Sequence, residues 1–276
     1  MKRNRRIGYI LFYLLLTLMV FLTLYPFITM ISGSFKTDME MNRFPLRIIP
    51  RNVTLENYEA LFRTIPFWRQ FMNSLIIAAT CAGLAMVLNG LVAYGFTRFS
   101  FKGRNVLFTM MLATMLIPGY VYMVPQFQMY RAMGLFGTYV PLLIPHTISA
   151  FGVFLISQVM RQIPLELYES ATIDGSSELK IFFLIAIPLS AAGIGIQGVL
   201  TFMGTWNDFM TPLIYLNEEI KYTLPIGLMR LQNFYKITYG SPLAGAFLSC
   251  IPVLIILTLV SQKYFVQGLV AGAVKG

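Results

Sequence analysis

The chain has 276 residues, of which 57% are hydrophobic and 12% are charged, and its mean hydropathy is +0.69. About a quarter of the residues are charged in an ordinary soluble domain, so this composition excludes a water-soluble fold and predicts an all-α polytopic membrane protein. The net charge of +10 does not indicate a nucleic-acid partner, because the basic residues gather at the ends of apolar stretches and form no continuous basic face.

Six apolar stretches are long enough to cross a bilayer, which takes about 20 helical residues. They are residues 7–31, 71–96, 106–124, 138–160, 185–215 and 243–262. The first follows a basic cluster, as in a signal peptide, but it exceeds an h-region of roughly 7–15 residues. We therefore expect an uncleaved first helix, bent near its outer end by Pro26. No repeat or linker divides the sequence, so residues 1–276 are expected to form a single transmembrane domain.

The charges of the connecting segments predict the orientation of the chain. With the N-terminus inside, the cytoplasmic segments carry Arg98, Lys102, Arg104, Arg161, Lys180, Lys263 and Lys275. The positive-inside rule therefore predicts a cytoplasmic N-terminus and C-terminus. The outer loop of about residues 32–69 is mixed in charge, and we expect it to be irregular with one short helix at 55–62. Residues 217–239 are expected outside as well.

One cytoplasmic connection, residues 161–188, is longer than the others and has its own pattern. Pro164 suits the first turn of a helix, and residues 165–174 are amphipathic on a helical wheel. Gly175 can end that helix in the left-handed conformation, and Ser176 or Ser177 can cap a second one. The sequence therefore predicts a helix–turn–helix loop.

Two readings of this loop differ in what it contacts. Its polar side carries Glu166 and Glu169, and Asp174 follows. A helix lying on the membrane surface would normally carry Lys or Arg there. An acidic and apolar knob instead suits docking into a groove on another protein, and we favour that reading.

The residues of the loop resemble a known signature. Glu169-Ser170-Ala171, then Gly175, then Ile185-Ala186-Ile187-Pro188 are similar to the EAA signature of inner-membrane permease subunits of binding-protein-dependent ABC importers. Ser170 replaces the second alanine of that signature, and Ile187 replaces its leucine. Two further stretches resemble maltose-type carbohydrate permeases: the run Thr205-Trp206-Asn207-Asp208-Phe209 and the ending 264–276. Permeases of that type form pairs, and the resemblance is to the second permease of the pair, which has six helices.

The resemblance implies a type I ABC importer permease-like bundle of six transmembrane helices in a bacterial or archaeal plasma (inner) membrane. It implies a transport subunit for a sugar or oligosaccharide, with no enzyme activity of its own. The implied partners are a second homologous permease, a dimer of ATP-binding cassette ATPases, an extracytoplasmic sugar-binding protein and membrane lipid. No cofactor is expected in this chain, since ATP and Mg would be bound by the ATPases. The sequence agrees in lacking a Gly-rich phosphate loop that ends in Gly-Lys-Ser or Gly-Lys-Thr.

The resemblance also assigns roles to residues of the loop. The segment from Glu169 to Gly175, with Asp174 before the glycine, would be the coupling helix that contacts the ATPase. Glu169 would anchor this helix, while Ala171 and Gly175 would permit close packing and the turn. Pro188 would fix where the fifth helix begins.

Candidates for the translocation pathway lie elsewhere in the chain. Asp208 is the only carboxylate in or near an apolar span, which makes it a functional candidate. A structural hydrogen bond at the helix end is an equally open reading. Its neighbours Trp206 and Asn207 are included as possible pathway residues, and Tyr120, Tyr122 and Phe127 near an outer helix end are further aromatic candidates.

We expect no metal site and no catalytic residue. His146 is the only histidine, and it has no Cys, Asp or Glu at ligand spacing beside it, so a hydrogen-bonded residue at a helix break is expected. Prolines cluster at the outer helix ends, where they either end helices or break them to line a cavity.

Two other classes of membrane protein are alternatives. An ion-coupled secondary transporter is the alternative function, and it would use intramembrane carboxylates and repeated halves. A membrane enzyme would need a nucleophile and base or a metal cluster within the spans. The sequence offers little for either class.

Overall fold

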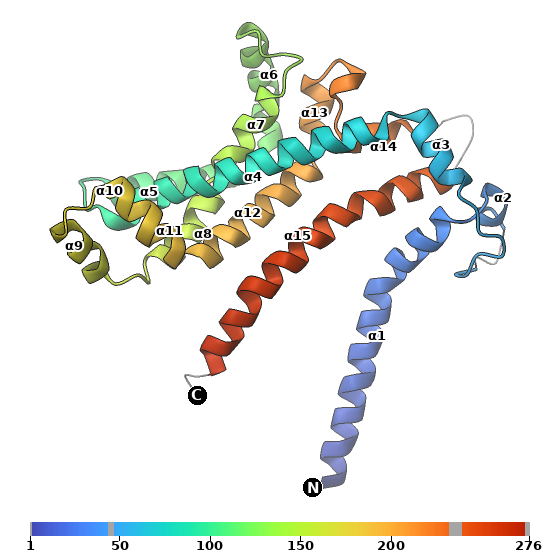
Figure 1. The fold of residues 1–276 in the computed structure, drawn as a ribbon, viewed down its shortest axis with the longest axis horizontal. Helices are drawn as coiled ribbons and strands as arrows, with labels where there is room; N and C mark the ends of the chain where they lie inside the picture. The colour runs from blue at the N-terminus through green and yellow to red at the C-terminus, as the bar shows by residue number, and fades with distance from the viewer. Residues whose placement is uncertain (1, 44–46, 232–238, 274–276) are drawn as a thin grey trace. The chain divides into compact units, whose positions relative to one another are not determined.

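A computed structural model of the chain describes residues 2–43, 47–231 and 239–273, and within these ranges the side chains of residues 8–260. Every regular element in the described ranges is helical (Figure 1), which confirms the all-α class. Within them, four segments are long and apolar enough to cross a membrane. They lie in α1 (Lys2–Ser34), α4 (Phe67–Arg98), the pair α7 (Val140–Thr147) and α8 (Ala150–Met160), and α15 (Gly240–Ala273).

The other two predicted spans are bent helix pairs, and they bring the number of spans to six if each pair is one span. The third span consists of α5 (Arg104–Ala113) and the 3-10 turn η1 (Thr114–Leu116), followed by a second 3-10 turn, η2 (Gly119–Tyr122), and α6 (Met123–Ala132). The two halves meet at 89°. Pro118 lies at the break in an extended conformation, because a proline disfavours helical geometry around it.

The fifth span begins within the predicted loop. It contains α10 (Glu178–Ile181), the π-turn η3 (Phe182–Ala186), α11 (Ile187–Leu189) and, after Ser190, α12 (Ala191–Trp206). The two halves meet at 83°. Pro188 has no N–H to donate, and the helix widens before it, where the Ile187 N–H donates to the Phe182 carbonyl. Pro188 thus lies inside the bend, whereas the helix that follows the loop begins at Glu178.

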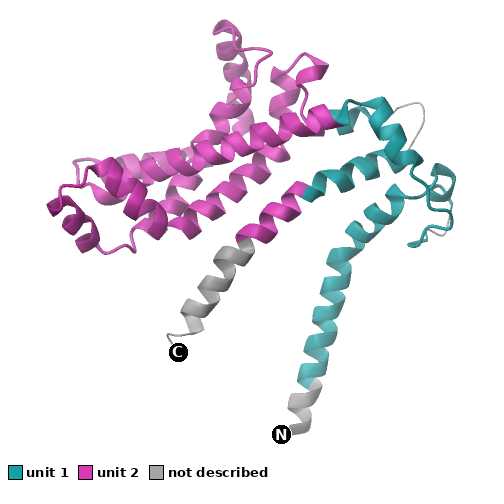
Figure 2. Cartoon of the chain, viewed as in Figure 1, with its two compact units in different colours: residues 1–67, 227–251 teal, residues 68–226, 252–276 magenta. Residues whose placement is uncertain are grey.

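The chain divides into two compact units, which are described separately (Figure 2). Unit 1 comprises residues 1–67 and 227–251 and contains α1, α2 (Asp38–Met41), α3 (Glu56–Thr64) and the first part of α15. The Asn57 amide donates to the carbonyls of Ser34 at 2.9 Å and Lys36 at 2.6 Å, and so ties α3 to the end of α1. The short helix expected at 55–62 is therefore present as α3. The single transmembrane domain stays a prediction.

Unit 2 comprises residues 68–226 and 252–276, and α4 takes part in two of its hydrophobic clusters. Toward its C-terminal end, Ala93 and Tyr94 pack against residues of α8, α9 (Leu165–Ile173), α10, η3 and α12. Toward its N-terminal half, Ile77 and Cys81 pack against residues of α6, α7 and α13 (Met210–Tyr215) and against Leu216. A rise of roughly 1.5 Å per residue separates Cys81 from Tyr94 by about 20 Å. We call these two regions the signature end and the cavity end of unit 2.

The remaining elements of the described chain are short. The 3-10 turn η4 (Glu219–Lys221) leads to α14 (Leu224–Arg230), and the Leu224 N–H donates to Ser74 Oγ of α4 at 2.8 Å. Helix α12 packs closely on α8, since a Cβ on Gly193 would lie 2.7 Å from Val159 Cγ2. Side chains of the motif at 264–276, and residues 232–238 of the segment expected outside, lie beyond the described residues.

Candidate functional site

The predicted helix–turn–helix loop is present, and its turn has a well-defined geometry. Helix α9 runs over Leu165–Ile173, with Asp174 as its C-cap. Gly175 follows with φ of +78°, and its N–H donates to the Thr172 carbonyl while the Ser176 N–H donates to the Ala171 carbonyl, both at 3.0 Å. These are the two bonds of a Schellman motif, which favours glycine at this position. Ser177 then caps α10.

Only a narrow side of α9 packs against its own chain. Tyr168 is buried, and Ala171 is half-buried against the cluster of the signature end. The amphipathic pattern of residues 165–174 would place Leu165 and Leu167 on the same side, but both are exposed, and Ile173 is 85% exposed. Together with the exposed acids they form what we call the loop surface: Leu165, Glu166, Leu167, Glu169, Ile173 and Asp174.

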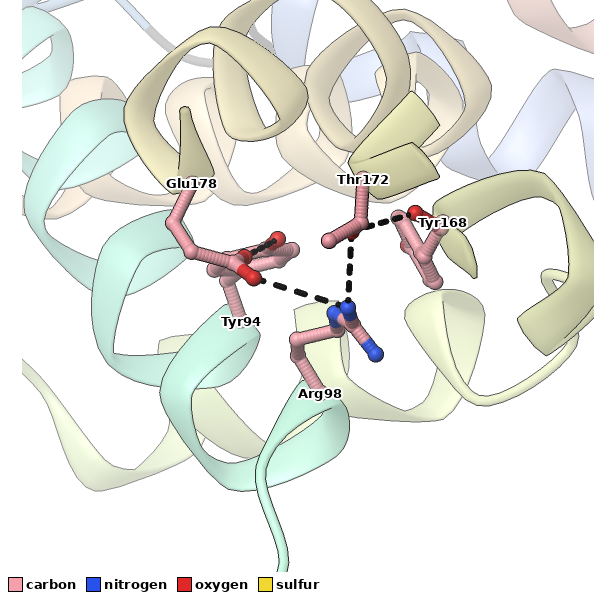
Figure 3. Close-up of polar contacts among 5 residues, drawn as sticks. All are labelled: Tyr94, Arg98, Tyr168, Thr172 and Glu178. Atoms are coloured by element: carbon pink, nitrogen blue, oxygen red, sulfur yellow. Dashed lines mark hydrogen bonds and ion pairs between the residues drawn. The ribbon is translucent and has the colours of Figure 1, made fainter. Parts of the chain in front are cut away.

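Helix α4 holds α9 through Arg98, the last residue of α4 (Figure 3). Arg98 Nη2 donates to Thr172 Oγ1 at 3.3 Å, and the guanidinium lies 5.6 Å from the centre of the Tyr168 ring. Thr172 Oγ1 in turn donates to the Tyr168 carbonyl at 2.8 Å. The Arg98 side chain is only 16% exposed, so the stacking over Tyr168 takes place largely out of water, where such a contact is strongest.

The same turn of α4 also holds α10. Tyr94 Oη donates to Glu178 Oε2 at 2.5 Å, and Arg98 Nη2 lies 3.4 Å from Glu178 Oε1 (Figure 3). Glu178 occupies the first turn of α10, where a negative charge is favourable. We call Tyr94, Arg98, Thr172 and Glu178 the α4 anchor. Because it contacts both helices of the loop, it fixes the loop to one transmembrane helix.

Reasoning from the sequence missed the α4 anchor. The sequence predicts Arg98 only as one of the charges that set orientation, and no local pattern singles out Glu178. The one available signal was the spacing of Tyr94 and Arg98, since residues four apart share a helix face. Their partner Glu178 lies 80 positions from Arg98, and no local pattern connects residues so far apart.

A cavity of about 310 Å³ lies at the cavity end of unit 2. Its walls come from η2 and α6, from α7, from the end of α12, from Asp208 in the segment that follows, and from α13. The polar and aromatic side chains that line it include Tyr120, Tyr122, Gln126, His146, Asp208 and Tyr215. Pro145 also lines the cavity, and Pro118 lies at the break just before η2. Of the two readings of the proline cluster, these two positions favour broken helices that line a cavity.

His146 and Asp208 meet in the wall of this cavity. His146 Nε2 lies 3.1 Å from Asp208 Oδ2, and Asp208 Oδ1 accepts the backbone N–H of Thr211, also at 3.1 Å. The side chains are 25% and 15% exposed. Helix α7 ends one residue after His146, so the expectation of a hydrogen-bonded histidine at a helix break is confirmed. Asp208 makes a structural hydrogen bond and also faces the cavity.

The neighbours of Asp208 lie differently. Trp206 is buried, with its ring 5.4 Å from that of Phe71 and 5.8 Å from that of Phe202. Asn207 donates its amide to the Met203 carbonyl at 2.9 Å. Of the three pathway candidates in this run, Asp208 is the one that lines the cavity.

Across the described ranges, no three His, Cys, Asp or Glu side chains gather as metal ligands.

The described chain is helical, has four to six segments that are long and apolar enough to cross a membrane, and presents an exposed helix–turn–helix loop fastened to the end of α4. Comparison with known proteins identifies its class. Residues 86–271 match the family described as binding-protein-dependent transport system inner membrane component. The match covers more than half of the chain, and the chain belongs to this family.

Relatives and solved structures agree with this assignment. The chain is 35% identical to the arabinooligosaccharides transport system permease protein AraQ of Bacillus subtilis, over 98% of this chain and 96% of the relative. It is 31% identical to the lactose transport system permease protein LacG of Rhizobium radiobacter, over 99% and 98%. A chain of a bacterial ABC transporter involved in import of the acidic polysaccharide alginate aligns with a TM-score of 0.84 at 23% identity, over 95% and 98%. This likeness confirms the expected permease fold.

Proposed function

We propose that this chain is the permease subunit of an ABC importer that moves a sugar or oligosaccharide into the cytoplasm. The sugar permeases among its relatives support the substrate class. The proposal includes a second homologous permease, an ATPase dimer that binds ATP and Mg, an extracytoplasmic sugar-binding protein and surrounding lipid. A solved transporter of similar fold is in complex with a periplasmic protein that holds an alginate pentasaccharide. This chain would supply the pathway and no ATP site.

The orientation is part of the proposal. The segments beside the signature end carry Arg98, Lys102, Arg104, Arg161 and Lys180. Basic residues are retained in the cytoplasm during insertion, so the loop surface would face the cytoplasm, with the N-terminus and C-terminus on the same side. The cavity end of unit 2 would then lie toward the outer face.

The observation that carries the proposal is the exposed loop surface on a firmly held helix. Leu165 and Ile173 lie on one stripe of α9 with Glu169 between them, four residues from each. Exposed apolar side chains beside acidic ones suit a groove with a basic rim. Glu169 would form the polar contact with the ATPase, and Asp174 and Gly175 would lie at the edge of the contact. Ala171 instead packs toward its own chain, against the cluster of the signature end.

The α4 anchor would transmit the motion of the docked loop. When the ATPases close, α9 would be displaced, and the bonds of Arg98 to Thr172 and Glu178 would carry α4 with it. A rigid-body switch between two states requires such fixed connections between the driven part and the moving helices. The bend at Pro188 would separate this moving part from the rest of the fifth span.

Co-purification followed by transport tests the proposal. A tagged chain taken from its native membrane is expected to bring down a second permease and an ATPase, and a Glu169→Lys, Gly175→Asn double variant is expected to lose the ATPase while it still inserts. In proteoliposomes that contain the complete importer and its binding protein, sugar uptake should require ATP on the side of the membrane where the ATPases lie. A protonophore should leave this uptake intact. Uptake that a protonophore abolishes and ATP removal leaves intact would establish the ion-coupled alternative instead.

A further inference from the structure

We propose that the cavity at the cavity end of unit 2 is a subsite for an uncharged sugar unit, and that its charge disfavours acidic sugars. This inference rests on the proposed function, and it adds a substrate class and a binding site in this subunit. It is carried by the composition and charge of the cavity wall.

The described residues of the wall include no Arg or Lys that could bind an anion. Apart from tyrosine hydroxyls, the titratable side chains that line it are His146 and Asp208, which contact one another at 3.1 Å. With a neutral imidazole the pair carries one negative charge, and with a protonated imidazole it carries none. Proteins hold carboxylates with Arg or Lys in paired geometry, and the residues that line the cavity include neither. A uronic acid would therefore lose the hydration of its carboxylate without gaining a cationic partner.

The same wall suits a neutral sugar. A sugar hydroxyl both donates and accepts, and the Gln126 amide offers both functions. A carboxylate has room for about four hydrogen bonds, so Asp208 retains acceptor capacity beside its contacts to His146 and Thr211. The rings of Tyr120 and Tyr122 are well exposed and can cover the apolar face of a pyranose or furanose.

The size of the cavity sets the length of sugar that it can hold. Its volume of about 310 Å³ lies at the lower end of the roughly 300–1,000 Å³ found for small-molecule sites. It fits a single sugar unit better than a long chain. The cavity would therefore bind one unit of an oligosaccharide at a time as the chain passes.

The test uses the complete importer, reconstituted with its binding protein, and three probes: arabinotriose, lactose and trigalacturonate. Uptake of at least one uncharged probe is expected, with trigalacturonate at least about tenfold slower, the factor given by roughly 1.4 kcal/mol. Comparable uptake of trigalacturonate would overturn the charge inference. Failure of the reconstituted importer to take up any sugar would remove the proposed function, and the inference with it.

Labelling locates the subsite. Met123→Cys, at a position that lines the cavity, is treated with a maleimide in a Cys250→Ser background, with and without each probe, and Val121→Cys is the matched control. Val121 is exposed on η2 and does not line the cavity. The transported neutral probe is expected to slow labelling at position 123 by about tenfold, to leave position 121 unchanged, and to do more than trigalacturonate does. Continued neutral uptake without protection at position 123 would overturn the subsite while leaving the proposed function standing.

Discussion

At the signature end of unit 2, Arg98 and Tyr94 hold two short helices whose outer sides are exposed and partly apolar. At the cavity end, the residues that matter line a cavity, and the side chains of His146 and Asp208 are mostly buried and contact each other. The first region presents a surface and fixes its position, as docking of a protein requires. The second leaves a space with few polar groups, as binding of a small solute requires. One helix, α4, contributes to both.

The largest expected effect is loss of docking at the loop surface. Glu169→Lys is predicted to reduce ATP-driven sugar uptake by about a hundredfold, because a reversed charge against a basic groove costs several kcal/mol. Uptake in proteoliposomes and co-purification of the ATPase should fall together. Full uptake with a fully retained ATPase would contradict the assignment of this surface. Insertion, measured by the yield of folded chain in the membrane, should not change.

Two substitutions at Gly175 separate contact from backbone strain. Asparagine tolerates φ of +78° far better than alanine does, and nothing in the described chain lies within 4 Å of a Cβ placed there. Gly175→Asn should therefore preserve the fold of the isolated chain and still impair docking, lowering uptake by more than about tenfold. If Gly175→Ala reduces uptake and Gly175→Asn does not, the glycine serves the turn alone.

A smaller effect is expected at the cavity end, and it should leave docking intact. Asp208→Asn keeps the shape of the side chain and removes the charge, so its hydrogen bond with His146 weakens by about 1–2 kcal/mol. Uptake of a neutral sugar is predicted to fall by about tenfold, while the ATPase co-purifies as in the parent complex. Loss of the ATPase from this variant would mean that the two ends do not have separate tasks.

The two regions also differ in how far the sequence predicts them. The turn at Gly175 and the caps of α9 and α10 depend on residues a few positions apart, and their pattern predicts them correctly. The pair of His146 and Asp208 spans 62 positions and that of Arg98 and Glu178 spans 80, so both depend on how the helices pack. The 89° and 83° bends are likewise not set by hydropathy, although Pro118 and Pro188 mark both places.

The smallest effect on stability is expected at the α4 anchor, since Glu178 is 43% exposed and solvent screens such pairs to about 0–1 kcal/mol. A double-mutant cycle of Arg98→Gln and Glu178→Gln should give a coupling free energy of unfolding within that range.

Transport is a more informative test of the α4 anchor, because a loosened loop can still dock while failing to move α4. We expect ATP hydrolysed per sugar imported to rise several-fold in Arg98→Gln, with the ATPase retained. Arg98→Lys should recover little of the loss, since a lysine keeps the charge but lacks the planar group that lies over Tyr168 and reaches both Thr172 and Glu178. Full recovery by lysine would reduce the anchor to a simple charge contact, and the link from the loop to α4 would then have to run through the packing of Tyr168 against Tyr94.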